Sequence, residues 1–364
     1  MRPLKGIALV CLSALAFGAS AQTIVLTQIS DFSGRGKGTS KPTSRGAQAC
    51  ISAYNATAGK AARARLEILD DQFDPARTAA LAEKAVAAGT SAFINSLGAG
   101  TSEALATVAD RAQIPVVGAM TGATSIRSQR RPSLFFLRSG ITQEGRHAVR
   151  QLVTLSLRDI AVFHTADAYG QDGLAAVTAA MQEAGLPAPR SASFDPAKPD
   201  VASPAQALAG ASAVVMFATG PTLIDFVKRI KANGSGAMLI AASTANMSAL
   251  VDGVGPASRG IGYLRTVPAP TERSRLGREF TELWRRHGDK EAPTPFHLEG
   301  CLAAQLALRA AGGVVSPAPA LMKRLKTGGL QNFGEFKVNF DSPSNEGSSW
   351  VGIAVVDQAG RLVD

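Results

Sequence analysis

The sequence predicts an α/β protein made of two similar lobes, each a parallel β-sheet covered by helices. Short apolar or β-branched runs alternate with alanine-rich stretches whose apolar residues recur three and four positions apart. This alternation is typical of parallel strands that are connected by helices. The chain has 364 residues, more than one hydrophobic core usually holds. The alternation also restarts midway along the chain, which favours two lobes over one large sheet.

Each predicted lobe contains four principal strands. The first set ends near Ala119, and the second set opens at Asp159 after an irregular segment, 127–140. The strands expected in the first lobe are Thr23–Ser30, Ala64–Leu69, Ala92–Leu97 and Pro115–Ala119. Those expected in the second lobe are Asp159–His164, Ala213–Phe217, Ala237–Ile240 and Gly260–Thr266.

Helices are expected between these strands. Asp74 followed by Pro75 is a clear start, because Asp caps a helix and proline suits its first position. The expected helices are Ser44–Thr57, Pro75–Ala88, Thr101–Arg111, Thr142–Leu155, Gly170–Ala184, Pro221–Ala232, Glu272–Arg286 and Phe296–Ala311. The chain is expected to end with the extended segments Phe333–Phe340 and Trp350–Val356.

The chain is expected to pass between the lobes more than once, and Pro268-Ala269-Pro270 suits one such connection. We therefore assign residues 22–138 and 268–328 to the first lobe. Residues 139–267 and 329–364 are assigned to the second.

The first 21 residues have the pattern of a secretory signal peptide. Arg2 and Lys5 precede an apolar run, 6–17, and Ala19-Ser20-Ala21 offers a cleavage site before Gln22. The run is about twelve residues, whereas a membrane span needs roughly 20. An exported protein is therefore expected, with a retained anchor as the alternative.

Composition argues against several function classes. The chain carries a net charge of +10, but aromatic residues are only 5% of the total, which disfavours a nucleic-acid interface. The four histidines are scattered without the spacing of metal ligands. Neither a metal nor a cofactor is expected.

Cys50 and Cys301 remain after removal of the signal peptide. An oxidising compartment permits a disulfide between them. Because each lies on an apolar helix face, we expect two buried free thiols and leave the disulfide as the alternative.

Gly34, Gly36 and Gly38 follow the first strand and, with Asp70 and Asp71, imitate a dinucleotide-binding fingerprint. The glycine spacing is wrong, and the acidic residues come later than the expected distance of about 20 residues. The segment is better interpreted as a flexible loop that offers backbone N–H groups at a strand end. No nucleophile motif such as G-x-S-x-G is present, so an enzyme is not expected.

The strongest candidate site consists of loops at strand ends, because ligands of parallel α/β sheets bind there. Residues 96–102 end one strand in small residues, and Thr101 or Ser102 then caps a helix whose N–H groups suit an anion. Residues 117–123 end the next strand similarly. In the second lobe, Tyr169 and Thr219 likewise follow the ends of predicted strands.

A series of short motifs then resembles a known family. They are Asp31-Phe32-Ser33-Gly34, Asn55-Ala56, Leu69-Asp70-Asp71-Gln72-Phe73-Asp74-Pro75, Gly100-Thr101-Ser102, Ile114-Pro115-Val116-Val117-Gly118, Thr121-Gly122-Ala123, Ile160-Ala161-Val162-Phe163, Asp167-Ala168-Tyr169-Gly170 and Leu298-Glu299-Gly300. In this order they resemble the periplasmic substrate-binding proteins of ABC importers, in the branch of the leucine/isoleucine/valine-binding proteins.

The resemblance implies two Rossmann-like lobes joined by three crossovers, which close on a small ligand by hinge motion. It also implies delivery of the ligand to an ABC permease in the inner membrane, periplasmic location and a monomeric protein. Carried onto this sequence, the family's ligand site comprises Ala99, Gly100, Thr101, Met120, Thr121, Gly122, Tyr169, Thr219 and Ser243.

The sequence departs from the family's amino-acid site at one strand end. An acidic residue usually meets the ligand's ammonium group there, but this chain reads Ala241-Ala242-Ser243-Thr244. Burying an ammonium group without a counter-charge is costly. Together with Met120 at a usually small position, and with Arg35 and Lys37 nearby, this favours a carboxylate that lacks an α-ammonium group.

Two other functions remain open from the sequence. One is a ligand-sensing protein that presents its solute to a membrane receptor, and the less favoured one is a secreted α/β hydrolase. Asp70, Asp71 and Asp74 are expected to shape and cap loops, and Arg138 to belong to the connection between the lobes.

Overall fold

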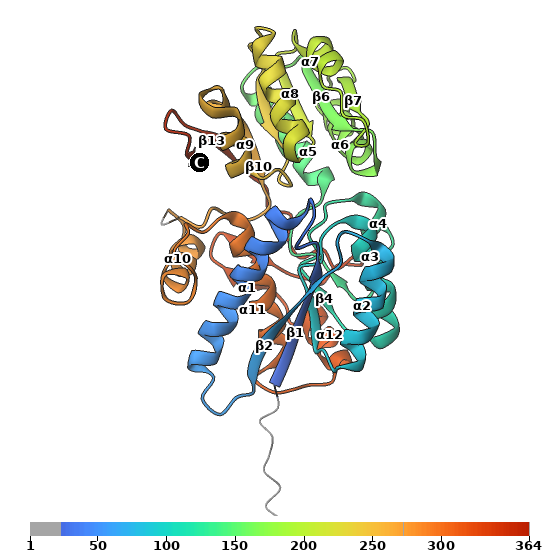
Figure 1. The fold of residues 1–364 in the computed structure, drawn as a ribbon, viewed down its shortest axis with the longest axis vertical. Helices are drawn as coiled ribbons and strands as arrows, with labels where there is room; N and C mark the ends of the chain where they lie inside the picture. Colours follow the sequence, from blue (N-terminus) through green and yellow to red (C-terminus); the bar gives the residue numbers. More distant parts are fainter. Residues whose placement is uncertain (1–22, 272, 364) are drawn as a thin grey trace, which may run out of the picture.

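The computed structural model describes residues 23–271 and 273–363, which form two lobes stacked along the long axis of the molecule (Figure 1). The expected signal peptide, residues 1–21, lies outside the described residues. Within the described part, no helix combines the length and apolarity that crossing a bilayer requires.

The first lobe contains the beginning of the described chain and a later return segment. Its first part is β1 (Thr23–Ser30), α1 (Lys37–Thr57), β2 (Arg63–Asp70), α2 (Pro75–Ala87), β3 (Ala92–Ile94), α3 (Ala99–Ala112), β4 (Val116–Val117), α4 (Thr124–Ser128) and β5 (Leu134–Phe135). The return segment is α10 (Arg275–His287), α11 (Pro295–Ala311), α12 (Ala318–Thr327), β11 (Gln331–Phe333) and β12 (Phe336–Val338).

The second lobe lies between these two parts in sequence and also receives the end of the chain. It contains α5 (Ile141–Thr154), β6 (Ile160–Thr165), α6 (Ala168–Glu183), β7 (Arg190–Phe194), α7 (Ala202–Leu208), β8 (Ala213–Phe217), α8 (Gly220–Ala232), β9 (Met238–Ala241), α9 (Met247–Val254), the 3-10 turn η1 (Gly255–Ser258) and β10 (Gly262–Arg265). β13 (Gly352–Val356) and β14 (Leu362–Val363) complete it.

The two sheets confirm the prediction of two α/β lobes joined by three crossovers. The first sheet has the order β2-β1-β3-β4-β5, with every pair parallel. The second has the order β14-β13-β10-β9-β8-β6-β7. Its pairs are parallel except at one edge, where β13 runs antiparallel to both β10 and β14. This edge corrects the expectation of a wholly parallel sheet: β10 leads out towards the first lobe and β13 enters from it, so the two run in opposite directions.

The expected boundary at residue 329 is wrong for the segment that follows it. Phe333 and Phe336, with Val338 and Phe340, lie in the hydrophobic core of the first lobe rather than the second. The ring of Phe340 meets that of Phe135 edge to face, with centroids 5.2 Å apart. The apolar side chains of the β11–β12 hairpin are therefore buried by the first lobe, and the chain returns to the second lobe only at β13.

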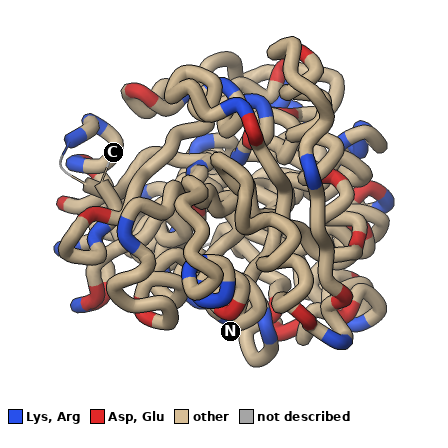
Figure 2. The backbone as a smooth tube through the Cα atoms, turned by 90° about the horizontal axis from the view of Figure 1, so that it is seen from above, with Lys and Arg blue, Asp and Glu red and all other residues tan. Residues whose placement is uncertain are grey.

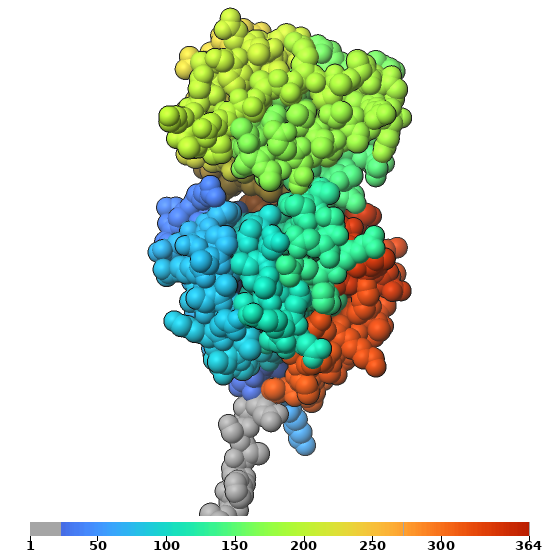
Figure 3. All heavy atoms as spheres, turned by 90° about the vertical axis from the view of Figure 1, so that its right-hand side faces the viewer, coloured from blue at the N-terminus to red at the C-terminus, as the bar shows by residue number. Residues whose placement is uncertain are grey.

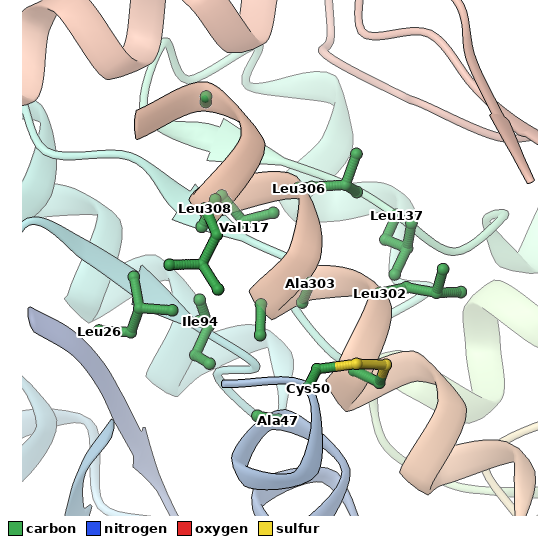
Figure 4. Close-up of a cluster of buried hydrophobic side chains, with 14 of the residues drawn as sticks. Leu26, Ala47, Cys50, Ile94, Val117, Leu137, Leu302, Ala303, Leu306 and Leu308 are labelled. Carbon is green, nitrogen blue, oxygen red and sulfur yellow. A yellow bond between two sulfur atoms is a disulfide. The ribbon is translucent and has the colours of Figure 1, made fainter. Parts of the chain in front are cut away.

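A disulfide joins α1 to α11 through Cys50 and Cys301, which corrects the expectation of free thiols (Figure 4). The two helices approach closely because each has a glycine at the contact. A Cβ atom on Gly46 would lie 1.8 Å from the carbonyl oxygen of His297, and one on Gly300 would lie 1.9 Å from that of Thr43. This close approach brings the cysteine Cα atoms within 5.2 Å of each other.

Removing the disulfide is predicted to destabilise the protein strongly, because the bond closes a loop of 251 residues. In the chain-entropy model such a loop contributes about 5 kcal/mol. The measurement is urea unfolding of the wild type with and without reductant, and of the Cys50→Ser/Cys301→Ser variant. The variant should match the reduced wild type and be insensitive to reductant; equal stability of oxidised and reduced wild type would contradict the prediction.

The crossovers meet around Arg138, which is 2% exposed. Its Nε lies 3.4 Å from Oε1 of Glu299, and its Nη2 donates to the hydroxyls of Ser243, at 2.7 Å, and Thr266, at 3.1 Å. Thr266, in the second crossover, in turn donates to Glu299 at 3.2 Å. These four residues, called here the hinge network, confirm the expected inter-lobe role of Arg138.

A second buried arginine ties the same region to the third crossover. Nη2 of Arg127 donates to the carbonyls of Thr121 and Arg138, at 3.0 and 2.9 Å, while Nη1 pairs with Glu346 at 2.9 Å. The hydroxyl of Ser139 donates to the carbonyl of Trp350 at 3.1 Å. The first and third crossovers are therefore bonded to each other.

Replacing Arg138 by methionine should lower the free energy of unfolding by about 3–5 kcal/mol, because it leaves the buried Glu299 carboxylate without its counter-charge. Arg138→Met combined with Glu299→Gln should recover a large part of that loss. Urea unfolding of the two single variants and the double variant gives the coupling energy. Additive losses would show that the two side chains do not depend on each other.

Candidate functional site

The candidate site lies where the two lobes face each other. In Figure 1 the strands of the first sheet end at the side of their lobe that faces the second lobe. The space-filling view shows the surface hollowed between the lobes (Figure 3). Loops that follow the strands therefore border this recess, as expected for parallel α/β sheets.

Two neighbouring loops of the first lobe form one wall of the site. Leu97 and Met120 form a parallel bridge that extends the pairing of β3 with β4. The Met120 N–H donates to the carbonyl of Ser96 at 2.6 Å, and the Gly98 N–H donates to the carbonyl of Met120 at 3.4 Å. The structure thus brings residues 96–102 and 117–123 side by side.

The N-terminus of α3 presents donors that the described chain does not use. The N–H groups of Ala99, Gly100 and Thr101 have no acceptor within residues 23–271 and 273–363. The Thr101 hydroxyl does not cap the helix, because it donates to the carbonyls of Leu97 and Gly98. Gly98 itself has a φ of +90°, which favours glycine at the turn that starts α3. The anion-binding capacity of this loop therefore rests on backbone N–H groups rather than on hydroxyls.

Met120, Thr121 and Gly122, called here the floor of the candidate site, lie beside this wall and are all buried. Gly122 lies against the second lobe, since a Cβ atom there would be 3.0 Å from Cγ1 of Ile141. Its carbonyl accepts from the Ile141 N–H at 2.9 Å. The floor of the site is therefore continuous with the first crossover.

In the second lobe, Tyr169 lies in the first turn of α6, which follows β6, and Thr219 lies between β8 and α8. The hydroxyl of the half-buried Tyr169 is bonded to that of Thr244, and its ring packs against Phe217. Burial raises the pKa of Tyr169 well above its usual range, so its hydroxyl stays neutral and able to donate. Thr219 is exposed at the start of α8 and makes no capping bond there.

Ser243 is placed differently from the expected ligand contact. Its N–H and hydroxyl donate to the two carboxylate oxygens of Glu144, at 2.9 and 2.8 Å, and its carbonyl accepts from Tyr263 at 3.0 Å. With Arg138 also donating to its hydroxyl, every polar group of Ser243 is engaged inside the protein. Ser243 therefore belongs to the hinge network.

Two buried carboxylates, Glu144 and Glu299, lie behind the site and are respectively 1% and 2% exposed. Burial raises the pKa of both, and the nearby Arg138 opposes this effect. Both carboxylates are already bonded, Glu144 to Ser243 and Glu299 to Arg138 and Thr266. Neither stands as a free counter-charge for a cationic ligand group.

Asp70, Asp71 and Asp74 shape and cap loops, as predicted. Their carboxylates accept hydrogen bonds from the backbone N–H groups of Phe32, Gln72, Phe73, Ala76 and Arg77. The glycine loop differs from the expectation. The Asp31 carboxylate accepts from the N–H groups of Gly34 and Gly36, at 2.6 and 2.7 Å, and α1 begins already at Lys37. The N–H groups of Gly34 and Gly36 are thus bonded internally rather than offered to a ligand.

Sequence reasoning missed the buried partners of the site. Glu144 was not predicted to have a role, although it lies in the first turn of a correctly placed helix. Thr244 and Glu299 belong to segments named in the sequence analysis, but neither residue was given a role there. Among the described residues, no group of three or more His, Cys, Asp or Glu side chains is arranged to hold a metal ion.

Solved structures share this architecture along almost the whole chain. An extracellular ligand-binding receptor from Verminephrobacter eiseniae has 25% identity and a TM-score of 0.85, over 94% of this chain and 100% of the other. A possible leucine/isoleucine/valine-binding protein from Rhodopirellula baltica has 20% identity and a TM-score of 0.86, over 96% and 98%. A solute-binding protein of an ABC transporter from R. palustris, solved in complex with benzoate, has 17% identity and a TM-score of 0.80, over 94% and 95%.

No curated protein sequence matches this chain. The model of the periplasmic binding protein family, in contrast, matches residues 23–361, nearly the full described length. Two α/β lobes, three crossovers and a site at facing strand ends agree with that match, and the chain belongs to the periplasmic binding protein family.

Proposed function

We propose that this protein is exported to the periplasm, captures a small organic carboxylate between its lobes and delivers it to an ABC permease. The family supplies the solute-binding role. The signal-peptide pattern supports export, as does the Cys50–Cys301 disulfide, because disulfides persist in oxidising compartments.

The proposed ligand class rests mainly on the N-terminus of α3. Three unused N–H groups at a helix N-terminus form a favourable site for a carboxylate. The buried carboxylates Glu144 and Glu299 are bonded to the hinge network and are not free to pair with an α-ammonium group. A carboxylate without an α-ammonium group fits this arrangement better than a standard amino acid. The benzoate complex of the R. palustris protein is a precedent on the same fold.

Capture then occurs by lobe closure without a chemical reaction. We propose Ala99, Gly100 and Thr101 as the carboxylate-binding wall and Met120, Thr121 and Gly122 as the floor. Tyr169 and Thr219 approach from the second lobe. A ligand that contacts both walls stabilises the closed arrangement, because it gains the second set of contacts only there. The closed form is the one that the permease is proposed to accept.

A thermal-shift screen of the mature protein tests the ligand class. Aromatic acids and dicarboxylates should raise the melting temperature, because a ligand that binds only the native state stabilises it by mass action. Standard amino acids and the neutral amides of the active acids should have little effect. A screen in which amino acids alone stabilise the protein would overturn the proposed ligand class.

Ala99→Pro should weaken carboxylate binding by about tenfold or more, because it removes one of the proposed donors. Proline is tolerated at the first helical position. The preceding residue, Gly98, has a ψ of 156°, which is compatible with a following proline. Calorimetric titration gives the affinity. Arg275→Pro, at the first position of α10, is the matched control and should bind normally. Equal affinity of all three proteins would remove α3 from the site.

A further inference from the structure

We propose that Arg35, stacked on the ring of Phe73, is a second anion receptor at the rim of the site and selects ligands for a carboxylate group. This inference rests on the proposed function and names a residue that distinguishes a carboxylate from its neutral counterpart. Arg35 lies just before α1, and Phe73 lies between β2 and α2.

The stacked pair adjoins the carboxylate-binding wall. The Arg35 guanidinium carbon lies 4.3 Å from the centroid of the Phe73 ring. The tip of the same ring reaches the start of α3, because a Cβ atom on Gly98 would lie 2.7 Å from Cζ of Phe73. Gly98 immediately precedes the unused N–H groups of α3. The guanidinium is therefore held beside the place where the carboxylate is proposed to bind.

A buried carboxylate fixes the loop that carries Arg35. Asp31 is 1% exposed, and its two oxygens accept from the N–H groups on either side of Arg35, those of Gly34 and Gly36. Gly36 is itself confined, since a Cβ atom there would lie 2.5 Å from Cδ2 of Leu97. The backbone at Arg35 is thus anchored while its side chain stays exposed.

A second buried carboxylate fixes Phe73. Asp71 is fully buried and accepts from the Phe73 N–H at 2.9 Å, and from the Thr78 hydroxyl at 2.9 Å. Phe73 has a φ of +62°, and Gln72 before it a φ of +54°. A bulky residue rarely adopts this conformation unless its surroundings impose it. The loop therefore projects Phe73 in one direction, towards Gly98 and Arg35.

Arg35 has no acidic partner among the described residues, as is also the case for several other exposed arginines such as Arg63 and Arg158. Figure 2 shows basic and acidic positions interspersed around the molecule. Arg45, in contrast, pairs with Asp289 and Glu291, and Arg146 pairs with Glu183. Within residues 23–271 and 273–363, the Phe73 ring is the only interaction partner of the Arg35 side chain. Its five N–H donors therefore remain available to a ligand.

Stacking makes this arginine a better receptor than a free surface cation. A guanidinium held flat on an aromatic ring presents its edge in a fixed plane and binds a carboxylate through two parallel hydrogen bonds. Lys37, two residues later, carries an ammonium group on a flexible stem. It supplies a point charge without the planar pair of donors that a guanidinium offers. Arg35 is thus assigned direct contact with the carboxylate, and Phe73 is a positioning residue.

The test compares two carboxylates with their neutral amides by calorimetric titration: benzoate with benzamide, and succinate with succinamide. Wild type should prefer each acid to its amide. Arg35→Ala should weaken binding of the acids by about tenfold and largely remove that preference. Arg35→Lys should recover only part of it, because it restores charge without the planar pair of donors. Phe73→Leu should weaken acid binding by about three- to fivefold and leave amide binding unchanged.

Arg158→Ala is the matched control, because Arg158 is an exposed arginine of the second lobe, two residues before β6. It should bind like wild type. Acid binding that is equal in wild type and Arg35→Ala would overturn this inference and leave the proposed ligand class standing. Failure of wild type to bind either acid would overturn both. Equal weakening of acid and amide binding in Phe73→Leu would show that Phe73 has only a structural role and does not position Arg35 for the carboxylate.

Discussion

The buried pairing of Arg138 with Glu299 is the constraint on which the arrangement of the lobes depends. Removing both charges from water is costly, and only a full set of partners offsets that cost. Those partners come from different parts of the chain: Thr266 from the second crossover and Ser243 from the end of β9. The network can be complete only when the crossovers lie together. Arg138, in the first crossover, thereby bonds both Ser243 of the second lobe and Glu299 of the first.

The site and the hinge are one continuous structure. The floor residue Gly122 contacts Ile141 of the first crossover, and Glu144, one turn further along α5, holds the strand end at Ser243. In the proposed function, a ligand on this floor lies beside α5, the first element of the second lobe, so that recognition and closure are coupled by direct contact. Arg127 also contacts the floor, since its Nη2 donates to the carbonyl of Thr121.

Local patterns predicted the elements well, and long-range partners poorly. β1 and β8 have the expected bounds, because buried strands appear as short apolar runs. α1 starts two turns earlier than expected, because the segment with Gly34, Gly36 and Gly38 was interpreted as a flexible loop. β7 was missed because this exposed edge strand, 190–194, lacks an apolar pattern. At the site, the loops were found because strand ends are local features. The engagement of Ser243 by Glu144 was not, because the two are 99 residues apart and no spacing rule connects them.

The disulfide also bears on how the chain assembles. Cys50 and Cys301 are 251 residues apart, so their bond cannot form until α11 has been synthesised and has packed against α1. The second lobe, in contrast, is built largely from one uninterrupted stretch, residues 141–265. It can therefore acquire its sheet while the first lobe still lacks α11 and the β11–β12 hairpin. Oxidation of the cysteines then marks the completion of the first lobe, and a disulfide-forming catalyst would act late in biogenesis, on a chain whose middle is already folded.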